Sequence, residues 1–535
     1  MENQNIAFVV IINNEDTTVN FLGVNEYLGV GYMKSHLKKN GINSKIHLVY
    51  SKDVDKIGEI FEAPPFLVGF AVYTDIATAV LKSAKILKEQ YPNVHITLGG
   101  PQTIGFDEDI LKDNAQIDSV ITGEGELVLL DLITKLRERQ ELAGCLGLTC
   151  RSNGSIIKNE AKSLIDDLDT LDFPDRDVFE MERQEYFYIA GSRGCLGFCS
   201  FCGETEIKRK FKKPYVRIRT PKNIVDEMEY LMNKYKLNSF RFTDATFEDP
   251  GEEGLKKAEG VFDEIIRRKL DVSLHIFSRA ELITENSKGY LEKGFRAGLE
   301  CIYVGIEAGN EPDLKLYNKK ASLQDNKRAI KVIREAGIHP AIGFICFNPY
   351  STYETLFENA DFLYQSGFGH VFYLYQTRLE LLPQSFIRRQ MLKDGLINDN
   401  KLYLHHFYDY RFKNPKIGEL HQVIKKAFEK TPIYFMDTLL GMQRVWVSKY
   451  LKDDRKASFD ELFSRIDEIK VARQKLNYDF FRTCVQMSKD DVPVAEIKAF
   501  AEREAQDIYY EEFEKLYFKI NVKVSKLRFK MFNML

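Results

Sequence analysis

Cysteine is scarce in this sequence: the chain has 8 cysteines among 535 residues. That number is far too low for a disulfide-stabilised scaffold, so we expect a protein of the reducing cytoplasm. The sequence also lacks any run of about 18 uncharged apolar residues, which argues against a membrane-spanning helix. Its first residues, MENQNIAFVVIINNEDTT, contain neither a basic leader nor a cleavage site, so we expect no secretion signal.

An excess of charge of one sign is missing as well. The 76 Lys and Arg residues nearly balance the 79 Asp and Glu residues, which gives a net charge of −3. Without a basic stripe, we expect no nucleic-acid partner. Aromatic residues make up 12% of the chain, which argues against extensive disorder. A chain of this length exceeds what one hydrophobic core supports, so several domains are expected.

Residues 1–140 alternate strand and helix signals. Buried strands are predicted where apolar residues run together, over residues 6–12, 46–50, 66–72, 96–98 and 119–122. Helices with one apolar face are predicted between them, for example over 25–40 and 75–89. This alternation is typical of a doubly wound, flavodoxin-like α/β domain. Residues 141–184, with scattered glycines and an acidic stretch, are predicted to be a linker.

A second alternating series occupies residues 185–385. Its predicted strands are residues 186–190, 239–243, 272–277, 302–306, 341–346 and 371–375. Six strand–helix units of this length predict a partial β/α barrel, in which chemistry gathers at the carboxyl ends of the strands. Residues 386–535 are predicted to form a mostly helical domain that caps the barrel and shapes a substrate pocket.

Three of the cysteines lie together, directly after the first predicted barrel strand. Cys195, Cys199 and Cys202 stand in GSRGCLGFCSFCGE. A structural zinc site or an ordinary iron–sulfur cluster needs a fourth ligand, and none follows nearby. Three thiolates therefore indicate a [4Fe–4S] cluster with one iron free to bind a chelating cosubstrate. The alternatives are three unpaired thiols, or a zinc ion completed by a distant residue such as His275.

The segment CLGFCSFC, with the aromatic Phe201 between its last two cysteines, resembles the cluster-binding signature of radical S-adenosylmethionine (SAM) enzymes. The resemblance implies that the free iron chelates SAM and that Phe201 lies beside the cofactor. It also implies that Asp244 and Thr246, after the second strand, bind the SAM amino group. The alternative for Asp244 is an exposed helix cap.

The third and fourth barrel strands end in further residues to which the resemblance assigns roles. Ser278 and Arg279 are expected to meet the SAM carboxylate or ribose, because a guanidinium suits a bidentate carboxylate contact. The alternative for Arg279 is a surface ion pair. Glu307 is expected to act in catalysis near the cosubstrate or substrate, or else to pair with Lys319 or Lys320.

The N-terminal segments LGVGYM, GFAVYT, LGGPQ and ITGEGE together resemble the cobalamin-binding domain that precedes many radical SAM domains. The resemblance implies cofactor contacts from the strand ends, namely Tyr73, Thr74, Gly99, Gly100, Pro101, Gly123, Glu124, Gly125 and Glu126. A D-x-H-x-x-G motif is absent, which implies base-off cobalamin with no histidine ligand. The alternative is a degenerate domain that no longer binds the cofactor.

The two resemblances together imply a cobalamin-dependent radical SAM methyltransferase. It would methylate an unactivated centre, expected to be carbon, in a biosynthetic intermediate or peptide. One alternative is a rearrangement or cyclisation with the same cofactors, and another is a non-catalytic metal-binding module. The expected partners are a small-molecule or peptide substrate and an electron donor such as flavodoxin or ferredoxin, with no nucleic acid and no membrane.

Overall fold

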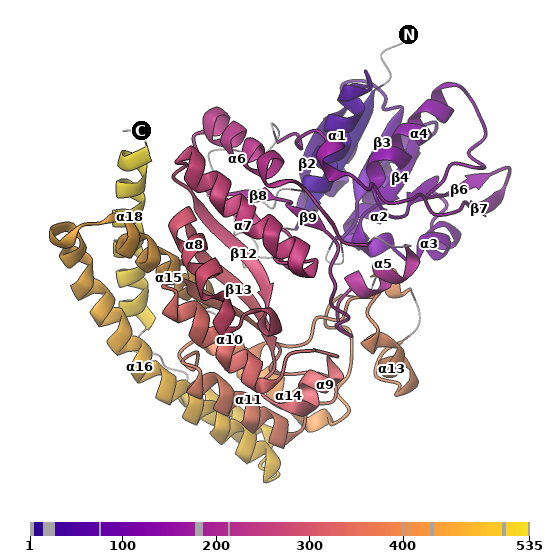
Figure 1. The fold of residues 1–535 in the computed structure, drawn as a ribbon. Helices are drawn as coiled ribbons and strands as arrows, with labels where there is room; N and C mark the ends of the chain where they lie inside the picture. The colour runs from indigo at the N-terminus through magenta and orange to yellow at the C-terminus, as the bar shows by residue number, and fades with distance from the viewer. Residues whose placement is uncertain are drawn as a thin grey trace.

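The computed structural model describes residues 5–13, 27–73, 76–176, 186–211, 215–398, 401–404, 406–427, 433–504 and 510–532. Three regions follow one another along the chain. Figure 1 shows them in order of colour: an N-terminal sheet domain, a central barrel and a C-terminal group of helices. Within these ranges, no helix combines the length and hydropathy needed to cross a bilayer.

The N-terminal domain is built on a seven-stranded sheet with the order β2-β1-β3-β4-β5-β6-β7. Its first five strands are parallel: β1 (Ile6–Ile12), β2 (Lys45–Tyr50), β3 (Leu67–Ala71), β4 (His95–Gly99) and β5 (Ser119–Ile121). The helical elements are α1 (Leu28–Lys39), the 3-10 helix η2 (Ser51–Ile60), α2 (Ala77–Gln90), α3 (Asp107–Asp113) and α4 (Gly125–Arg137). The strand order is the flavodoxin-like one, so the predicted fold class is confirmed.

Strand β1 shows why the strands of this sheet are continuous apolar runs in the sequence. Phe8 and Val10 are buried in one core cluster with residues of α1 and α4. Ala7 and Val9, which alternate with them, are buried in another cluster with residues of η2 and α2. Because successive strand side chains point to opposite faces, a sheet covered on both faces needs apolar residues at every position.

The segment predicted as a linker instead extends the sheet. Residues 148–158 form an antiparallel hairpin of β6 (Leu148–Ser152) and β7 (Ser155–Lys158), and β6 pairs with β5. Asn153 and Gly154 make the turn with φ values of +49° and +80°. An Asn-Gly pair between short strands is a strong hairpin signal, so the linker prediction was wrong for these residues.

The central sheet has the order β14-β13-β12-β11-β8, and all its strands are parallel. They are β8 (Phe187–Ile189), β11 (Ser239–Phe242), β12 (Ser273–Arg279), β13 (Leu299–Glu307) and β14 (His339–Phe344). The helices among them are α5 (Glu204–Lys210), α6 (Pro221–Tyr235), α7 (Gly251–Arg268), α8 (Lys288–Ala297), α9 (Glu311–Leu316), α10 (Leu323–Glu335) and α11 (Tyr353–Gln365). A short antiparallel pair, β9 (Ser192–Arg193) with β10 (Arg217–Ile218), accompanies the first unit.

The sixth barrel strand was predicted in the wrong place. Residues 371–375 fall almost entirely in a helix, α12 (Phe372–Gln376). The sixth position is held instead by an isolated parallel bridge between Phe347, which follows β14, and Arg378. A short apolar run does not distinguish a strand from a buried helical turn, which explains the error.

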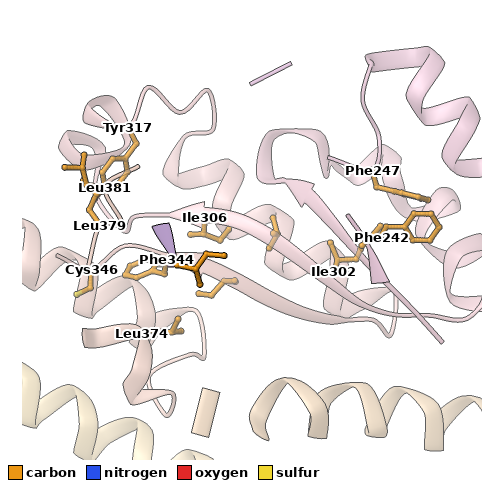
Figure 2. Close-up of a cluster of buried hydrophobic side chains, with 14 of the residues drawn as sticks. Phe242, Phe247, Ile302, Ile306, Tyr317, Phe344, Cys346, Leu374, Leu379 and Leu381 are labelled. Atoms are coloured by element: carbon orange, nitrogen blue, oxygen red, sulfur yellow. The ribbon is translucent and has the colours of Figure 1, made fainter. Parts of the chain in front are cut away.

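The barrel sheet is packed against its helices by a continuous apolar cluster. Figure 2 shows this cluster running along β13, from Phe242 and Phe247 at one end to Tyr317 at the other. The rings of Phe242 and Phe247 meet edge to face with centroids 4.7 Å apart. Glu307 alternates along β13 with the fully buried Ile306, so its side chain leaves this core and faces the interior of the barrel.

The C-terminal region is helical, as predicted. It comprises α13 (Ile387–Lys393), α14 (Pro415–Ala427), α15 (Ile433–Tyr450), α16 (Asp453–Lys489), α17 (Val494–Glu504) and α18 (Tyr510–Phe532). Helix α16 contains 37 residues and packs against α11 and α14 toward one end and against α15 and α18 toward the other. Figure 1 shows it running along the outside of the barrel.

Gly298, which ends α8, is expected to tolerate no side chain. Its φ is +110°, and a Cβ built there would lie 2.0 Å from the carbonyl oxygen of Val272. Gly298→Ala should therefore lower the free energy of unfolding by about 2 kcal/mol or more, as measured by chemical denaturation followed by circular dichroism.

Gly289 in the same helix is the matched control, because a Cβ there meets nothing within 4 Å. Gly289→Ala should leave stability unchanged or raise it by up to about 1 kcal/mol. Equal unfolding curves for the two variants would contradict the steric argument.

Candidate cofactor site

The cysteine loop, residues 194–203, lies at the carboxyl end of the first barrel unit, between β9 and α5. Gly194 opens it with a φ of +95°, and a Cβ there would lie 2.6 Å from the carbonyl oxygen of Tyr215. Glycine is therefore required for the loop to turn this close to the backbone that leads into β10.

Hydrogen bonds from a distant part of the chain fix the centre of the loop. Ser200 donates from its amide to the carbonyl oxygen of Tyr317 (2.9 Å) and from its hydroxyl to that of Leu316 (2.6 Å). The side-chain amide of Asn318 donates to the carbonyl oxygen of Phe198 (2.8 Å). The ring of Phe201 meets Tyr317 edge to face at 5.5 Å, so Phe201 supports the loop through the segment after α9.

The sulfurs of Cys195 and Cys199 converge on Gly197. A Cβ built on Gly197 would lie 3.3 Å from Cys195 Sγ, 3.9 Å from Cys199 Sγ and 3.5 Å from Arg279 Nη1. Cys202 follows one turn later, and its amide donates to the carbonyl oxygen of Cys199 (3.2 Å). Burial raises the pKa of all three thiols, that of Cys202 to about 12. Their thiolates therefore need a cationic centre beside them.

The donor set on this loop fits an iron–sulfur cluster by its chemistry, because thiolates are the usual ligands of such clusters. Over the ranges that the structure describes, no three His, Cys, Asp or Glu side chains gather closely enough to hold one metal ion. His275 lies inside β12 with its ring stacked on Phe277 at 5.6 Å, and burial lowers its pKa well below the ordinary value. Nothing in this arrangement supports the alternative of a zinc ion completed by His275.

Asp249 connects the cysteine loop to the end of β12. One carboxylate oxygen accepts from the amide of Leu196 (2.8 Å), and the other accepts from Arg279 Nη2 (2.8 Å). Arg279 also lies 3.3 Å from Glu281, while its Nη1 is buried and has no hydrogen-bond partner among the residues that the structure describes. The guanidinium thus forms a partly buried ion pair and still directs one unused donor toward the cysteines. Its predicted contact with the SAM carboxylate stays a prediction.

Asp244 is fully engaged by the protein. Its oxygens accept from the amide of Gly191 (2.7 Å), the hydroxyl of Ser192 (2.6 Å) and the ammonium of Lys257 (3.0 Å). It is not the exposed helix cap considered as an alternative. Binding the SAM amino group would require one of these bonds to be exchanged, and that predicted role remains untested. The hydroxyl of Thr246 lies 3.9 Å from the Sγ of Cys195, one of the predicted cluster ligands.

Ser278 faces a buried carboxyl group that the sequence analysis did not identify. Its hydroxyl donates to Glu248 (3.0 Å), and the hydroxyl of Tyr290 lies 3.3 Å from the other oxygen of Glu248. Burial raises the pKa of Glu248 to about 7. Ser278 is therefore engaged inside the barrel wall, and its predicted contact with SAM stays a prediction.

Glu307 pairs with Lys319, as the alternative interpretation proposed. Its Oε1 lies 3.4 Å from Lys319 Nζ, and both side chains are largely buried. The backbone of Glu307 has a φ of +65°, at an irregularity in the pairing of β13 with β14. A non-glycine residue in this conformation is strained, and such strain is commonly found at functional sites. Burial raises the pKa of Glu307, although Lys319 opposes that rise.

The two glutamates of ITGEGE bind arginines of the barrel. Glu124 accepts from Arg193 Nη1 (2.8 Å) and from Arg217 Nη1 (2.8 and 2.9 Å), and Glu126 accepts from Arg193 Nη2 (2.7 Å). Burial raises the pKa of Glu124, but the two arginines outweigh burial and hold that pKa below its ordinary value. These four residues, called here the Glu–Arg cluster, join the N-terminal domain to the cysteine loop. The predicted contacts of Glu124 and Glu126 with cobalamin stay predictions.

Close packing surrounds three of the four glycines at the N-terminal strand ends. Gly100 has a φ of +103°, and a Cβ there would lie 2.8 Å from the carbonyl oxygen of Val72. A Cβ on Gly123 would lie 2.6 Å from the ring of Phe211, and one on Gly125 would lie 2.7 Å from the sulfur of Met33. Gly99 has no such contact, since a Cβ there lies 3.8 Å from its nearest neighbour.

Three further residues predicted to contact cobalamin differ in their surroundings. The ring of Tyr73 packs against Tyr27 with centroids 5.2 Å apart. The carbonyl oxygen of Pro101 accepts from the side-chain amide of Gln384 (2.8 Å), which ties this strand end to the segment after the barrel. Thr74 lies outside the described residues.

Comparison with known proteins agrees with both halves of this architecture. A model of the B12 binding domain matches residues 15–133, and a model of the radical SAM superfamily matches residues 189–363. The chain therefore contains a region similar to the B12 binding domain, followed by a region similar to the radical SAM superfamily. The two domains imply a [4Fe–4S] cluster with SAM in one and cobalamin in the other, and the three cysteines lie within the matched radical SAM region.

The relatives of this chain are named for different activities. The chain is 31% identical to the anaerobic magnesium-protoporphyrin IX monomethyl ester cyclase of Rubrivivax gelatinosus, over 62% of this chain and 60% of that protein. It is 27% identical to the uncharacterized methyltransferase PH0819 of Pyrococcus horikoshii, over 61% of this chain and 70% of that protein. The match thus spans less than two-thirds of the cyclase.

A solved structure shows that the fold extends over nearly the whole chain. OxsB, a cobalamin-dependent S-adenosylmethionine radical enzyme with aqua-cobalamin bound, superposes with a TM-score of 0.67 at 16% identity. The similarity covers 97% of this chain and 84% of that chain. The shared fold therefore includes the C-terminal helices that lie beyond the two domain matches.

Replacing Cys195, Cys199 or Cys202 singly with Ala should abolish iron and sulfide loading, because each removes one of only three thiolates on the loop. Iron and acid-labile sulfide are measured after anaerobic reconstitution. Cys484→Ala is the matched control, since Cys484 is buried in α16 far along the chain from the loop. Full iron loading of any loop variant would contradict the ligand assignment.

Glu248 should make stability depend on pH. Its pKa is near 7 in the folded protein against 4.5 ordinarily, so between these values the unfolded chain releases a proton that the folded protein keeps. Stability should therefore fall as the pH rises through this range, by about 3 kcal/mol from this group. Denaturant unfolding at about pH 5 and pH 8 measures the change.

Glu248→Gln should flatten this dependence, because the neutral amide does not titrate. Glu292→Gln, a change at an exposed glutamate of α8, is the control and should keep the wild-type profile. Parallel pH profiles of wild type and Glu248→Gln would show that Glu248 is not the group responsible.

Proposed function

We propose that this protein is a cobalamin-dependent radical SAM methyltransferase that methylates an unactivated carbon of a biosynthetic intermediate or peptide. The observation that carries the proposal is the direct junction between the two domains: Glu124 and Glu126, which follow β5, accept hydrogen bonds from Arg193, the residue directly before the cysteine loop. Two cofactors that act on one substrate must lie close together, and this junction supports that arrangement.

Different barrel residues are proposed to bind the cluster and SAM. Cys195, Cys199 and Cys202 are the proposed cluster ligands. Arg279, oriented by Asp249, offers its free Nη1 to the carboxylate of SAM. Thr246, Ser278 and Phe201 are proposed as further contacts around SAM. When bound, the cluster with SAM supplies a 5′-deoxyadenosyl radical, and cobalamin supplies a transferable methyl group.

Glu307 and Lys319 are proposed to lie at the substrate side of the site. Their buried ion pair faces the barrel interior beside Cys199, whose thiol pKa responds to both residues. A buried pair of this kind orients a polar substrate group while the surrounding apolar wall excludes water. The electron donor is proposed to be a flavodoxin or ferredoxin.

Cobalamin is proposed to bind over the strand ends that carry Gly99, Gly100 and Gly123, in a base-off form without a histidine ligand. The sequence supports this mode, because the segments that follow β1, β3, β4 and β5 contain no histidine. His95 belongs to this domain but begins β4, so it lies at the opposite edge of the sheet.

A second candidate is a cyclisation or rearrangement with the same cofactors. The observation that favours it is the cyclase named among the relatives, which is 31% identical over the matched region. Both candidates need SAM cleavage, but only the methyltransferase consumes a second SAM as methyl donor and releases S-adenosylhomocysteine.

A substrate-free assay separates the two candidates. The protein is purified anaerobically, reconstituted with iron, sulfide and hydroxocobalamin, desalted, and incubated with SAM and a low-potential reductant. The methyltransferase should retain cobalt and a corrinoid absorption band and form both S-adenosylhomocysteine and 5′-deoxyadenosine. Cys199→Ala should lose the 5′-deoxyadenosine.

Formation of 5′-deoxyadenosine without S-adenosylhomocysteine would refute methylation and favour the second candidate. Loss of all cobalt on desalting would refute both, because neither proceeds without the corrinoid.

A further inference from the structure

We infer that Glu124 and Glu126 are positioning residues that fix the cysteine loop to the cobalamin-binding edge of the N-terminal sheet. Glu124 lies in the turn between β5 and α4, and Glu126 lies in the first turn of α4, at the carboxyl edge of that sheet. In a doubly wound domain this edge is where ligands bind. The inference rests on the proposed function for its cofactors, but its contacts are within the protein.

The turn contacts the chain on both sides of the three cysteines. Before them, Arg193 donates to both glutamates, and it stands two residues before Cys195. After them, Phe211 follows α5 and packs on Gly123, where a Cβ would lie only 2.6 Å from its ring. Holding both ends of a loop restricts its whole length, so movement of the turn is transmitted to the sulfurs.

Within the Glu–Arg cluster, both carboxylate oxygens of Glu124 accept hydrogen bonds. Glu124 Oε2 accepts from the amide of Ile165 (2.7 Å) in addition to Arg217 Nη1, which itself donates to the carbonyl oxygen of Ile165 (2.9 Å). The guanidinium of Arg193 lies over the ring of Tyr32 in α1 at 5.1 Å. Several charge-assisted bonds in fixed directions define one geometry, whereas a single apolar contact permits sliding.

This geometry separates the two glutamates from cofactor ligands. An acidic side chain that contacted the corrin amides would keep a carboxylate oxygen available, but the two oxygens of Glu124 are both used by protein donors. Glu126 is almost fully buried and directs Oε1 at Arg193. Their effect on chemistry would therefore be indirect, through the distance between cobalt and the cluster.

Hydrogen–deuterium exchange of the full-length protein tests the positioning role without any cofactor. In Glu126→Gln, which removes the charge on only one of the two bonds of Arg193, amides of residues 194–203 should exchange about tenfold faster or more. Amides of α7 should keep their wild-type rates. Glu124→Gln should increase the exchange of these amides further. If Glu124→Gln does not fold, Glu126→Gln alone carries the test.

Glu108→Gln is the matched control. It neutralises a carboxylate of the same domain that pairs with Lys158 at 3.0 Å within that domain. Unchanged exchange of residues 194–203 in Glu126→Gln would overturn the inference. An equal rise throughout the protein, or the same rise in Glu108→Gln, would overturn it too, because either result would indicate general destabilisation.

The cofactor-loaded protein supplies a second readout. Pulsed electron paramagnetic resonance between cob(II)alamin and the reduced cluster should give one narrow distance in the wild type and a broadened distribution in Glu126→Gln. An identical narrow distribution in both would overturn the inference. If the wild type shows no corrinoid or no cluster, the proposed function fails, while the exchange experiment still decides the role of the glutamates.

Discussion

The pairing of Glu124 and Glu126 with Arg193 and Arg217 is the interaction on which the relation between the two domains depends. Buried charges are costly to remove from water, and this cost is recovered only when every charge meets its partner in good geometry. Taking away one partner of such a pair costs about 3–5 kcal/mol. The domains are therefore held in one arrangement because each of these charged groups must keep its partner, in addition to the apolar contacts between the domains.

The same rule organises the barrel side of the site. Asp249 joins Leu196 of the loop to Arg279 of β12, and Lys319 joins Glu307 of β13. Each set of contacts links the end of a strand to a neighbouring segment, so polar contacts fix the rim of the barrel at two places. The apolar cluster of Figure 2 holds the strands from outside, and these polar contacts help to determine how the strand ends face one another.

Much of the fold was predictable because periodicity and spacing are local properties. The parallel strands of the N-terminal sheet and the cysteine spacing were read correctly, since each depends on residues close in sequence. The hairpin at Asn153-Gly154 was predictable from its turn but was missed, and α12 was misread because five apolar residues suit either structure. The partners of Glu124 and Asp244 were not predictable, because their donors lie 69 and 53 residues away and only folding brings them together.

Helix α16 imposes a mechanical asymmetry on the barrel. At about 1.5 Å per residue, its 37 residues extend roughly 55 Å as one rod. Tyr478 and Arg482 attach this rod to Asp361 of α11, and Arg444 of α15 attaches to it through Asp467. Widening the barrel on that flank would mean tilting the entire rod or breaking its backbone ladder. Among the described residues, α13 (Ile387–Lys393) and its connecting segments include no helix of comparable length, so resistance to widening is concentrated on the α16 flank.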